Sequence, residues 1–536
     1  MSRISRRRFL EVAAGAAVVA AVPAGSGAAP RRGGVLKHIG VEPPTFDIHA
    51  PDASVPTLLM SSFVRRTLFK FVHSGVRGAS GLTVTPDLAR AARLSPDGRI
   101  CTISLRPGVR WESRLPVYGR ELVGADVKYS LDRALRRSTS GRLLGPMEGI
   151  ETPDRYTVRL RLAEPFPPLL HHLAEPWAAV LPVEVEDKLG HFRGPESLIG
   201  CGPFALERFE PGIKAVFSRN PTYYQPGLPY LDKVEWIFVW DRATQLSLFR
   251  AGQIDIPSPD GRIPPSEVDA LRTSRPAFPV AFWDGLAVRT LAMRTDRPPF
   301  SDHRVRRALS LAIDRTRWVA RYLEGHGSED DGAVPVAFTE WKLPRSALGA
   351  GARFLDHDPA LARSLLAEAG FAHGLKVKCT YWAGAGPEYV EEIEQLACAF
   401  KEIGVDLVLV GEDFDSYVHG SALGKYDEAT WGASAVFTEV DDYLYGFYRS
   451  GQRDNRSHVA DARLDAMLDA QRRYTRRSAR KKLIDDIQRY TAEQAFYLYT
   501  PRPPNVSSWA PWVKNYAPTN SLDRGAQLEV TWLDRS

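Results

Sequence analysis

The chain has 536 residues, of which 44% are hydrophobic and 25% are charged, and its formal net charge is +6. This composition is typical of a globular protein with two or three domains, and it excludes a disordered chain and a membrane-embedded bundle. The first 29 residues carry four arginines and one glutamate, so the rest of the chain has a charge of only +3. Because this charge is scattered, the sequence lacks the basic stripe that nucleic-acid binding requires.

The amino end has the pattern of a twin-arginine export signal. The segment Ser5–Leu10, Ser-Arg-Arg-Arg-Phe-Leu, is followed by an Ala- and Val-rich run over 12–22. That run is too short for a membrane span of ~20 residues, and small residues suited to cleavage follow it up to Ala29. No cysteine precedes Cys101, which excludes a lipid anchor at the amino end. We therefore expect the twin-arginine translocase to export a soluble, unlipidated chain to the periplasm.

The first half of the mature chain is rich in predicted strands. A short strand is expected over 34–39, and a strand-rich block extends from about 69 to 195. Within this block two turns containing Pro-Asp each precede a segment in which apolar and polar residues alternate, over 99–106 and 158–162. Alternation with a period of two after such turns predicts half-buried strands.

The second half changes to helical spacing. Asp302 and Asp358 are predicted helix N-caps, the latter followed by proline at the first helical position, and Gly370 ends the second helix. A strand over 377–382, a helix over 388–403 and a strand over 405–410 predict a parallel crossover unit. One helical stretch is expected over 462–495.

The sequence contains no recognisable catalytic motif. It lacks a Gly-x-Ser-x-Gly elbow, a His-Glu-x-x-His helix, a phosphate-binding glycine loop and a Cys-x-x-Cys pair. His171, His172 and Glu175 share a segment, but its leucines favour a core helix over a metal site. The four cysteines are too few for a disulfide scaffold and are expected to be free thiols. We therefore expect no enzymatic activity, no metal and no cofactor.

An ordered series of motifs resembles family 5 of the extracellular solute-binding proteins, the periplasmic receptors of peptide- and nickel-type ABC importers. The resemblance extends over nearly the whole mature chain and depends on the order of the motifs. These are Leu88-Ala89, Ser95–Gly98, Leu105–Trp111, Ala125–Ser130, Gly202–Phe204, Arg219–Pro221, Pro229–Asp232, Pro298–Phe300, Arg304–Arg306, Ala312–Arg315, Glu368–Gly370 and Gly404–Asp406.

This resemblance implies an α/β fold like that of the type II periplasmic binding proteins, with two lobes, a hinge and an inserted extra domain. It implies a signal peptide over 1–29, a discontinuous domain I (30–69, 196–286 and 498–536), a strand-rich domain II (70–195) and a domain III (287–497). A ligand would be enclosed between domains I and III by hinge closure. The expected partners are a small-molecule or peptide solute and an inner-membrane ABC permease, and the receptor is expected to be a monomer.

The sequence departs from the peptide-binding relatives at both charged anchors. A Trp-x-x-Asp strand in those relatives pairs its carboxylate with the peptide amino terminus, and here Ser434 stands in the place of the aspartate. An unpaired ammonium is costly to bury, so a free amino group is not expected there unless Glu439, Asp441 or Asp442 replaces that carboxylate. The loop over 381–387 also lacks the arginine that dipeptide receptors use to hold the carboxylate.

The segments 404–412 and 431–433 are more similar to the nickel branch of the family. That branch places a histidine a few residues beyond the second segment, and this chain has none near Thr438. A direct nickel–imidazole bond is therefore not expected, whereas a metal held wholly by a chelator stays open.

The predicted solute site combines aromatic side chains with a few polar groups, as binding clefts commonly do. We expect an oligopeptide-like or modified peptide solute, with a metal–chelate or sugar-type ligand as the alternative and a secreted hydrolase as the rival from another class. The candidate ligand-binding residues are Glu42, Phe46, Trp283, Arg294, Tyr381, Trp382, Trp431 and Ser434.

Overall fold

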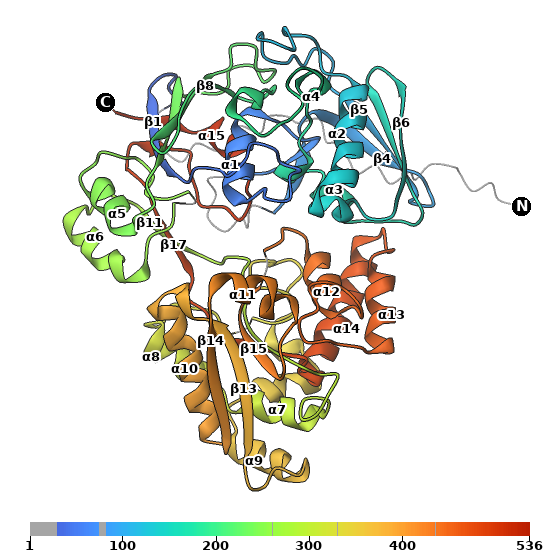
Figure 1. Cartoon of the computed structure of the whole chain (residues 1–536), viewed down its shortest axis with the longest axis vertical. Coiled ribbons are helices and arrows are strands. Elements are labelled where there is room, and N and C mark those ends of the chain that lie inside the picture. Colours follow the sequence, from blue (N-terminus) through green and yellow to red (C-terminus); the bar gives the residue numbers. More distant parts are fainter. Residues whose placement is uncertain (1–28, 74–81, 260, 330, 435, 536) are drawn as a thin grey trace, which may run out of the picture. The chain divides into compact units, whose positions relative to one another are not determined.

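The computed structural model describes residues 29–73, 82–259, 261–329, 331–434 and 436–535. The predicted export signal thus lies outside the described residues, apart from Ala29. The chain forms two compact units, unit 1 up to residue 281 together with residues from 506 onward, and unit 2 over 282–505 (Figure 1). It passes from one to the other in strands β11 (Val280–Trp283) and β17 (Asn505–Ser508), which pair as a two-stranded sheet.

The first sheet of unit 1 has four strands in the order β1-β10-β9-β8. Only β1 and β10 are parallel, and the other neighbours are antiparallel. Helix α1 (Val55–Val64) packs on this sheet through Phe63, whose ring contacts Phe204, Phe217 and Trp236. The strands are β1 (Val35–Gly40), β8 (Phe204–Glu210), β9 (Lys214–Arg219) and β10 (Lys233–Phe238).

The second sheet of unit 1 is antiparallel, with the order β4-β5-β7-β6, and helix α2 (Gly124–Arg137) packs against it (Figure 1). Alternate residues of β5 are buried, as the period of two predicts, so the strands expected over 99–106 and 158–162 are confirmed. The strands are β4 (Ala89–Leu94), β5 (Ile100–Leu105), β6 (Met147–Asp154) and β7 (Thr157–Leu162).

A buried charge cluster connects the carboxyl-terminal segment to the start of the strand-rich block. Arg66 bridges Asp87 at 2.6 Å and Asp523 at 3.1 Å, and Lys70 pairs with Glu529. Buried charges persist when they are paired in this way. The other elements of unit 1 are β2 (Phe69–Phe71), β3 (Val84–Pro86), α3 (Leu169–His172), α4 (Val183–Leu189), α5 (Arg242–Arg250), α6 (Val268–Ser274), β18 (Val513–Lys514), α15 (Arg524–Leu528) and β19 (Trp532–Leu533).

Unit 2 is built on a five-stranded sheet with the order β14-β13-β15-β12-β16. The predicted crossover unit is confirmed, because β13 and β14 are parallel and α10 (Pro387–Lys401) connects them and packs against β14 (Figure 1). The strands are β12 (Arg289–Met293), β13 (Leu375–Trp382), β14 (Val405–Glu412), β15 (Ala429–Ala433) and β16 (Tyr497–Thr500).

Both predicted N-caps of unit 2 are confirmed. The side chain of Asp302 accepts from the backbone N–H of Arg304, and that of Asp358 accepts from Leu361. The single stretch expected over 462–495 is two helices that pack on each other, because the chain turns between Gln471 and Arg477. The helices are α7 (His303–Leu311), α8 (Arg315–Tyr322), α9 (Pro359–Glu368), α11 (Phe414–His419), α12 (Val440–Tyr448), α13 (Ala462–Gln471) and α14 (Arg477–Gln494).

The crossings between the units lie at 281/282 and 505/506, a few residues outside the expected limits 287 and 497 of domain III. The two connections, β11 and β17, are themselves strands that pair with each other. A hydropathy pattern does not distinguish such strands from those of the neighbouring sheets. Unit 1 contains two hydrophobic clusters, one on each of its four-stranded sheets. The division into three domains stays a prediction.

All four cysteines are free, and only Cys398 is exposed. Within the described ranges, no helix combines the length and the apolar character needed to cross a bilayer. In the same part of the chain, His, Cys, Asp and Glu side chains do not gather in groups of three or more that could hold a metal ion.

Candidate functional site

Strand direction gives the sheet of unit 2 one edge suited to ligand binding. Strands β13, β14, β15 and β16 run in one direction and β12 in the other. The carboxyl ends of four strands and the first residue of β12 therefore meet at the same edge. Ligands of open α/β sheets bind outside the carboxyl ends of the strands. We call this edge, with Arg289, Tyr381, Trp382, Glu412, Ala433 and Ser434, the carboxyl edge of unit 2.

Three aromatic residues lie at the carboxyl edge, and two of them are in contact. Tyr381 and Trp382 are the last two residues of β13, and both are half-buried. The ring of Trp382 meets the ring of Phe414, the first residue of α11, edge to face at 5.1 Å. Phe414 is 55% exposed, although exposing such a ring to water is unfavourable. The pair of Trp382 and Phe414 offers aromatic surface of the kind that binding clefts use.

Trp431, a predicted ligand contact, belongs to the core of unit 2. Its exposed fraction is 0%, and its ring packs on that of Tyr389 with 4.4 Å between the centroids. The backbone carbonyl of Trp431 accepts a hydrogen bond from the Tyr417 hydroxyl at 3.3 Å. The indole Nε1 has no hydrogen-bond partner among the described residues. In this structure Trp431 therefore packs in the core next to the carboxyl edge.

Gly432 lets two tyrosines approach the backbone of β15. A Cβ atom at this position would overlap the hydroxyl oxygen of Tyr417 and would lie 2.5 Å from that of Tyr389. Both tyrosines are buried, and burial raises the pKa of the Tyr389 hydroxyl above its ordinary value. The close approach, and not an unusual backbone angle, explains why glycine stands here.

An arginine that the sequence analysis did not select lies at the same edge. Arg289 pairs in register with Ala433, and its Nε donates to Glu392 at 3.0 Å. Its guanidinium stacks on the ring of Tyr389, 4.9 Å from the centroid. Glu392 is largely buried, so burial raises its pKa even though Arg289 pulls it down. No periodicity in the sequence marks Arg289, because its place depends on β12 running against its neighbours.

Glu412 contributes a carboxylate at the end of β14. One oxygen accepts from the Ser421 hydroxyl at 3.0 Å, and Ser421 in turn accepts from Thr380 at 2.8 Å. The second oxygen is buried and has no hydrogen-bond partner among the described residues. Because Glu412 lies two residues beyond the strand predicted over 405–410, the rule that ligands bind at the carboxyl ends of strands could have selected it from the sequence.

Ser434 extends the pairing between β15 and β12. Its N–H donates to the carbonyl of Val288 at 2.9 Å, and its hydroxyl accepts from the N–H of the same residue at 3.2 Å. Two of the carboxylates considered as substitutes for the missing aspartate are engaged elsewhere. Glu439 pairs with Arg480 at 2.6 Å and Asp441 with Arg472 at 3.0 Å.

The structure does not bring Arg294 to this edge. Arg294 follows β12 and lies beside the amino end of β15, at the opposite end of the sheet. Its guanidinium binds both carboxylate oxygens of Asp296, at 2.8 and 2.6 Å. Trp283 lies on β11, one of the two connections between the units, and is half-buried.

In unit 1 the predicted residues Glu42 and Phe46 differ in exposure. Phe46 is 5% exposed and packs edge to face on Phe209, so it belongs to the core. Glu42 follows β1 and accepts a hydrogen bond from the N–H of Gly212 at 2.9 Å. Trp240, two residues beyond the parallel strand β10, is 71% exposed and was not predicted. Glu42 and Trp240 thus follow the carboxyl ends of neighbouring parallel strands.

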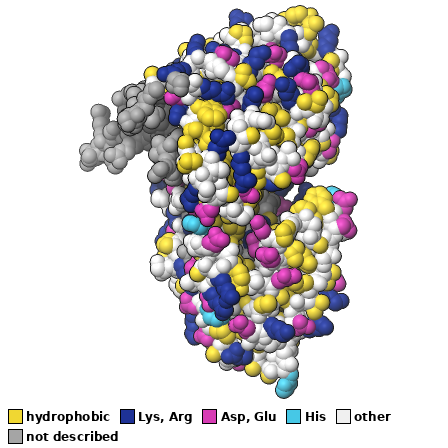
Figure 2. All heavy atoms as spheres, turned by 90° about the vertical axis from the view of Figure 1, so that its left-hand side faces the viewer, with side chains coloured by type: hydrophobic (Ala, Val, Ile, Leu, Met, Phe, Trp, Pro, Cys, Tyr) yellow, Lys and Arg dark blue, Asp and Glu magenta, His cyan; other side chains and the backbone are white. Residues whose placement is uncertain are grey.

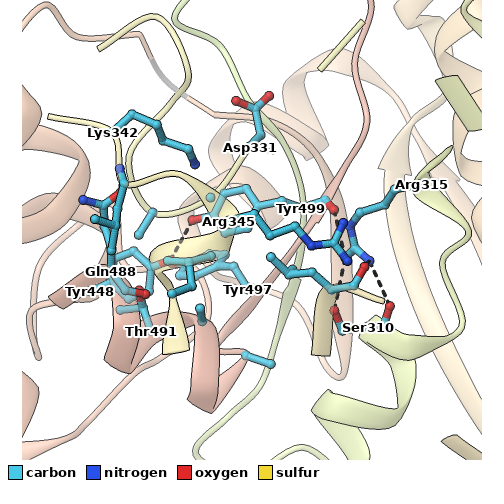
Figure 3. Close-up of a pocket in the computed structure, with 17 residues that line it drawn as sticks. Ser310, Arg315, Asp331, Lys342, Arg345, Tyr448, Gln488, Thr491, Tyr497 and Tyr499 are labelled. Carbon is cyan, nitrogen blue, oxygen red and sulfur yellow. Dashed lines mark hydrogen bonds between the residues drawn. The ribbon is translucent and has the colours of Figure 1, made fainter. Parts of the chain in front are cut away.

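Unit 2 also encloses a polar cavity between α7, α12, α14 and β16 (Figure 3). The Tyr448 and Tyr499 hydroxyls share a hydrogen bond of 2.6 Å, and Arg315 donates to the Ser310 hydroxyl at 3.1 Å (Figure 3). The cavity has a volume of about 40 Å³, whereas ligand pockets typically have ~300–1,000 Å³. It therefore suits a few ordered water molecules and not the solute.

The face drawn in Figure 2 shows basic and acidic side chains interspersed among hydrophobic ones. No continuous basic stripe crosses the described residues of this face. The two α/β units both carry polar and aromatic side chains at the carboxyl ends of their strands.

A profile of the bacterial extracellular solute-binding proteins, family 5, middle region, matches residues 83–455. The chain belongs to this family, which confirms the resemblance of its motifs. The family consists of solute-binding proteins and not of enzymes, so the rival hypothesis of a secreted hydrolase is set aside.

Named relatives agree with this assignment. Di/tripeptide-binding protein 1 of Pseudomonas aeruginosa (strain UCBPP-PA14) is 26% identical over 80% of this chain and 82% of its own length. The glutathione-binding protein GsiB of Salmonella paratyphi A is 28% identical over 58% of this chain and 57% of its own length. The periplasmic binding protein DppA of Helicobacter pylori, solved with the peptide STSA, aligns over 94% of this chain and 99% of its own with a TM-score of 0.75 and 22% identity. This last likeness confirms the α/β fold.

Proposed function

We propose that the protein is the periplasmic receptor of an ABC importer and that its solute is a peptide or a modified peptide. The observation that carries the proposal is the carboxyl edge of unit 2, where the aromatic pair Trp382 and Phe414 lies at the same edge as an arginine and a carboxylate. Relatives named for di- and tripeptides and for glutathione support the same class of solute.

The polar groups at the edge suit a short peptide-like molecule. The aromatic rings offer contact area, and Arg289 and Glu412 offer opposite charges on strands that are three positions apart in the sheet. At about 4.8 Å per strand their backbones are separated by ~14 Å. Arg289 contacts Glu392 and Tyr389 of α10, whereas Glu412 contacts Ser421, so the two side chains would contact different parts of a solute.

Direct binding measurements test the class of solute. The protein is unfolded, dialysed and refolded to remove any retained molecule, and calorimetric titration then follows di- and tripeptides, glutathione, a sugar and a nickel–histidine chelate. We expect micromolar or tighter binding of at least one peptide or of glutathione. Binding of the sugar or the chelate alone would replace the peptide with the alternative ligand class.

Trp382 provides a matched variant for the same titration. Trp382→Ala removes an aromatic side chain from the carboxyl edge and should weaken binding by at least about tenfold. Trp318, a mostly buried tryptophan of α8, is the control position. Trp318→Phe should keep the affinity of the folded protein.

We further propose that the twin-arginine translocase exports the protein to the periplasm, where it delivers its solute to an inner-membrane ABC permease. The signal has three consecutive arginines, of which Arg6 and Arg7 occupy the paired positions and Arg8 the free one. Replacing Arg6 and Arg7 by lysine should leave the precursor in the cytoplasm, whereas Arg8→Lys should not affect export. Fractionation of cells that express each variant measures this, and normal export of the double variant would contradict the route.

A further inference from the structure

Arg289 is held in place from two sides while its outer nitrogens stay unused. Glu392 accepts from its Nε at 3.0 Å, and the ring of Tyr389 lies under the guanidinium. Neither Nη1 nor Nη2 makes a hydrogen bond or ion pair with a described residue. The Arg289 side chain is 26% exposed, whereas that of Glu392 is 12% exposed. The guanidinium is thus oriented by the protein and keeps free donors.

A second arginine meets the same residue of β15. Arg456, in the segment between α12 and α13, donates from Nη1 to the carbonyl oxygen of Ala433 at 3.0 Å. Ala433 is also the residue opposite Arg289 in the ladder between β15 and β12. Arg456 forms no ion pair with the described residues, and it is only half-buried. Arg456 thus contacts the backbone of the residue that pairs with Arg289, and Glu392 is the one carboxylate that pairs with either arginine among the described residues.

Three other arginines of unit 2 are instead paired with carboxylates. Arg294, directly after the same strand, uses its guanidinium on both oxygens of Asp296. Arg304 is paired with Asp302, and Arg449 with Asp465 and Asp469. A planar guanidinium with free, oriented N–H groups matches the two oxygens of a carboxylate, and a pair of this kind is among the strongest polar contacts.

We infer that Arg289, assisted by Arg456, binds a carboxylate of the solute. The inference rests on the proposed function, and it narrows the solute to peptides or modified peptides with a free carboxylate, either at the carboxyl terminus or on a side chain. Glu392 and Tyr389 are positioning residues, because they act on the solute only through the guanidinium of Arg289. In this subsite the arginine comes from β12, and the loop over 381–387 contributes no charged side chain.

The test compares peptides that differ only in the carboxylate. A tripeptide that binds the wild-type protein is titrated as the free acid and as the carboxyl-terminal amide, and we expect the free acid to bind at least about tenfold more tightly. Arg289→Gln should weaken binding of the free acid by about thirtyfold or more. The same variant should change the affinity of the amide less than threefold, and Arg456→Gln should act in the same direction with a smaller effect.

Matched variants separate recognition from folding. Arg294→Gln removes an arginine from the opposite end of β12 and should leave both affinities unchanged. Because Arg289→Gln leaves Glu392 without its partner, the double variant Arg289→Gln with Glu392→Gln is measured as well. It should fold and should lose the same discrimination. An amide that carries an aspartate and regains the affinity would support the subsite and assign it to a side-chain carboxylate.

The two proposals fail in different ways. If the wild-type protein binds the acid and the amide equally and Arg289→Gln changes neither affinity, the carboxylate subsite is refuted while the peptide receptor stands. If the wild-type protein binds no peptide in either form, the proposed function is refuted and the subsite with it. Calorimetry on the refolded, ligand-free protein gives both results in one series.

Discussion

Replacing Gly432 with alanine tests the packing that supports the carboxyl edge. The new methyl group would overlap the hydroxyl oxygen of Tyr417 and would lie 2.5 Å from that of Tyr389. Both tyrosines are buried against β15, so neither hydroxyl can move without losing contacts. Tyr417 would also give up its 3.3 Å hydrogen bond to the carbonyl of Trp431.

The expected cost is the sum of two effects. Overpacking a filled site costs about 1–3 kcal/mol, and the lost hydrogen bond costs about 1 kcal/mol. Gly432→Ala should therefore lower the free energy of unfolding of unit 2 by about 2–4 kcal/mol. Equilibrium urea denaturation of the ligand-free protein measures this. For a unit of this size each kcal/mol lowers the melting temperature by ~2–4 °C.

A double-mutant cycle identifies the contact that is responsible. Tyr417→Phe removes the oxygen that the methyl group would overlap, so Gly432→Ala should cost about 1–2 kcal/mol less in that background. Tyr426 is a buried tyrosine of the same unit whose hydroxyl bonds to the carbonyl of Arg456, and Tyr426→Phe serves as the control. A change below about 0.5 kcal/mol for Gly432→Ala, the size usual for a surface substitution, would refute the close approach of the tyrosines. If Gly432→Ala costs as much in the Tyr417→Phe protein as in the Tyr426→Phe protein, the role of Tyr417 is refuted.

Three further predictions concern other parts of the chain. Trp431→Ala should lower the free energy of unfolding by about 3–5 kcal/mol, whereas Trp382→Ala should cost less than about 1 kcal/mol and act on solute affinity instead. His49 is neutral in the fold, because burial and the charge of Arg133 lower its pKa to about 4. An unfolded histidine binds its proton below a pH of about 6.5, so stability should fall by about 2 kcal/mol between pH 7 and pH 5. Of the four thiols, only Cys398 should react with a thiol reagent in the native protein, since the other three are buried.

Each of these has a control. Trp431→Ala should keep its solute affinity once the folded fraction is taken into account, and a loss comparable to that of Trp382→Ala would return Trp431 to the ligand site. The free energy of unfolding differs between pH 7 and pH 5, and His49→Gln should reduce this difference by about 2 kcal/mol. An unchanged difference would contradict the prediction that His49 is neutral in the folded protein. Cys398→Ser should abolish native labelling, and unfolding should expose the remaining thiols. Burial raises the pKa of Cys101 to about 12, which keeps it unreactive.

The His49 prediction depends on a defined set of neighbours. Its Nδ1 accepts from Arg133, which can only donate, so Nε2 carries the hydrogen and donates to the carbonyl of Trp177. Arg133 is itself bonded to both oxygens of Asp47. The positive charge of Arg65 also lowers the pKa of His49. A proton on His49 would therefore meet two arginines and one carboxylate that is already paired.

Local features of the sequence determined the elements of this protein. Alternating residues after a Pro-Asp turn gave β5, and Asp302 and Asp358 capped the helices that they were predicted to cap, because a strand face and an N-cap depend on neighbours a few residues away. The ordered motifs likewise sufficed for the family. The same local signals joined α13 and α14 into one stretch, since the turn between them follows from how the two helices pack on each other.

Only part of the candidate site could be predicted from such local features of the sequence. Tyr381, Trp382 and Ser434 end or follow strands that the pattern or the resemblance located, and they do lie at the carboxyl edge. Arg289 and Arg294 stand five residues apart on one segment, and only the antiparallel direction of β12 places the first at that edge and the second at the opposite one. Trp431 is adjacent in sequence to the edge but faces the core. Which side chains meet was decided by strand order and direction, because these arise from pairing between residues as much as 211 positions apart, as between Arg289 and Thr500.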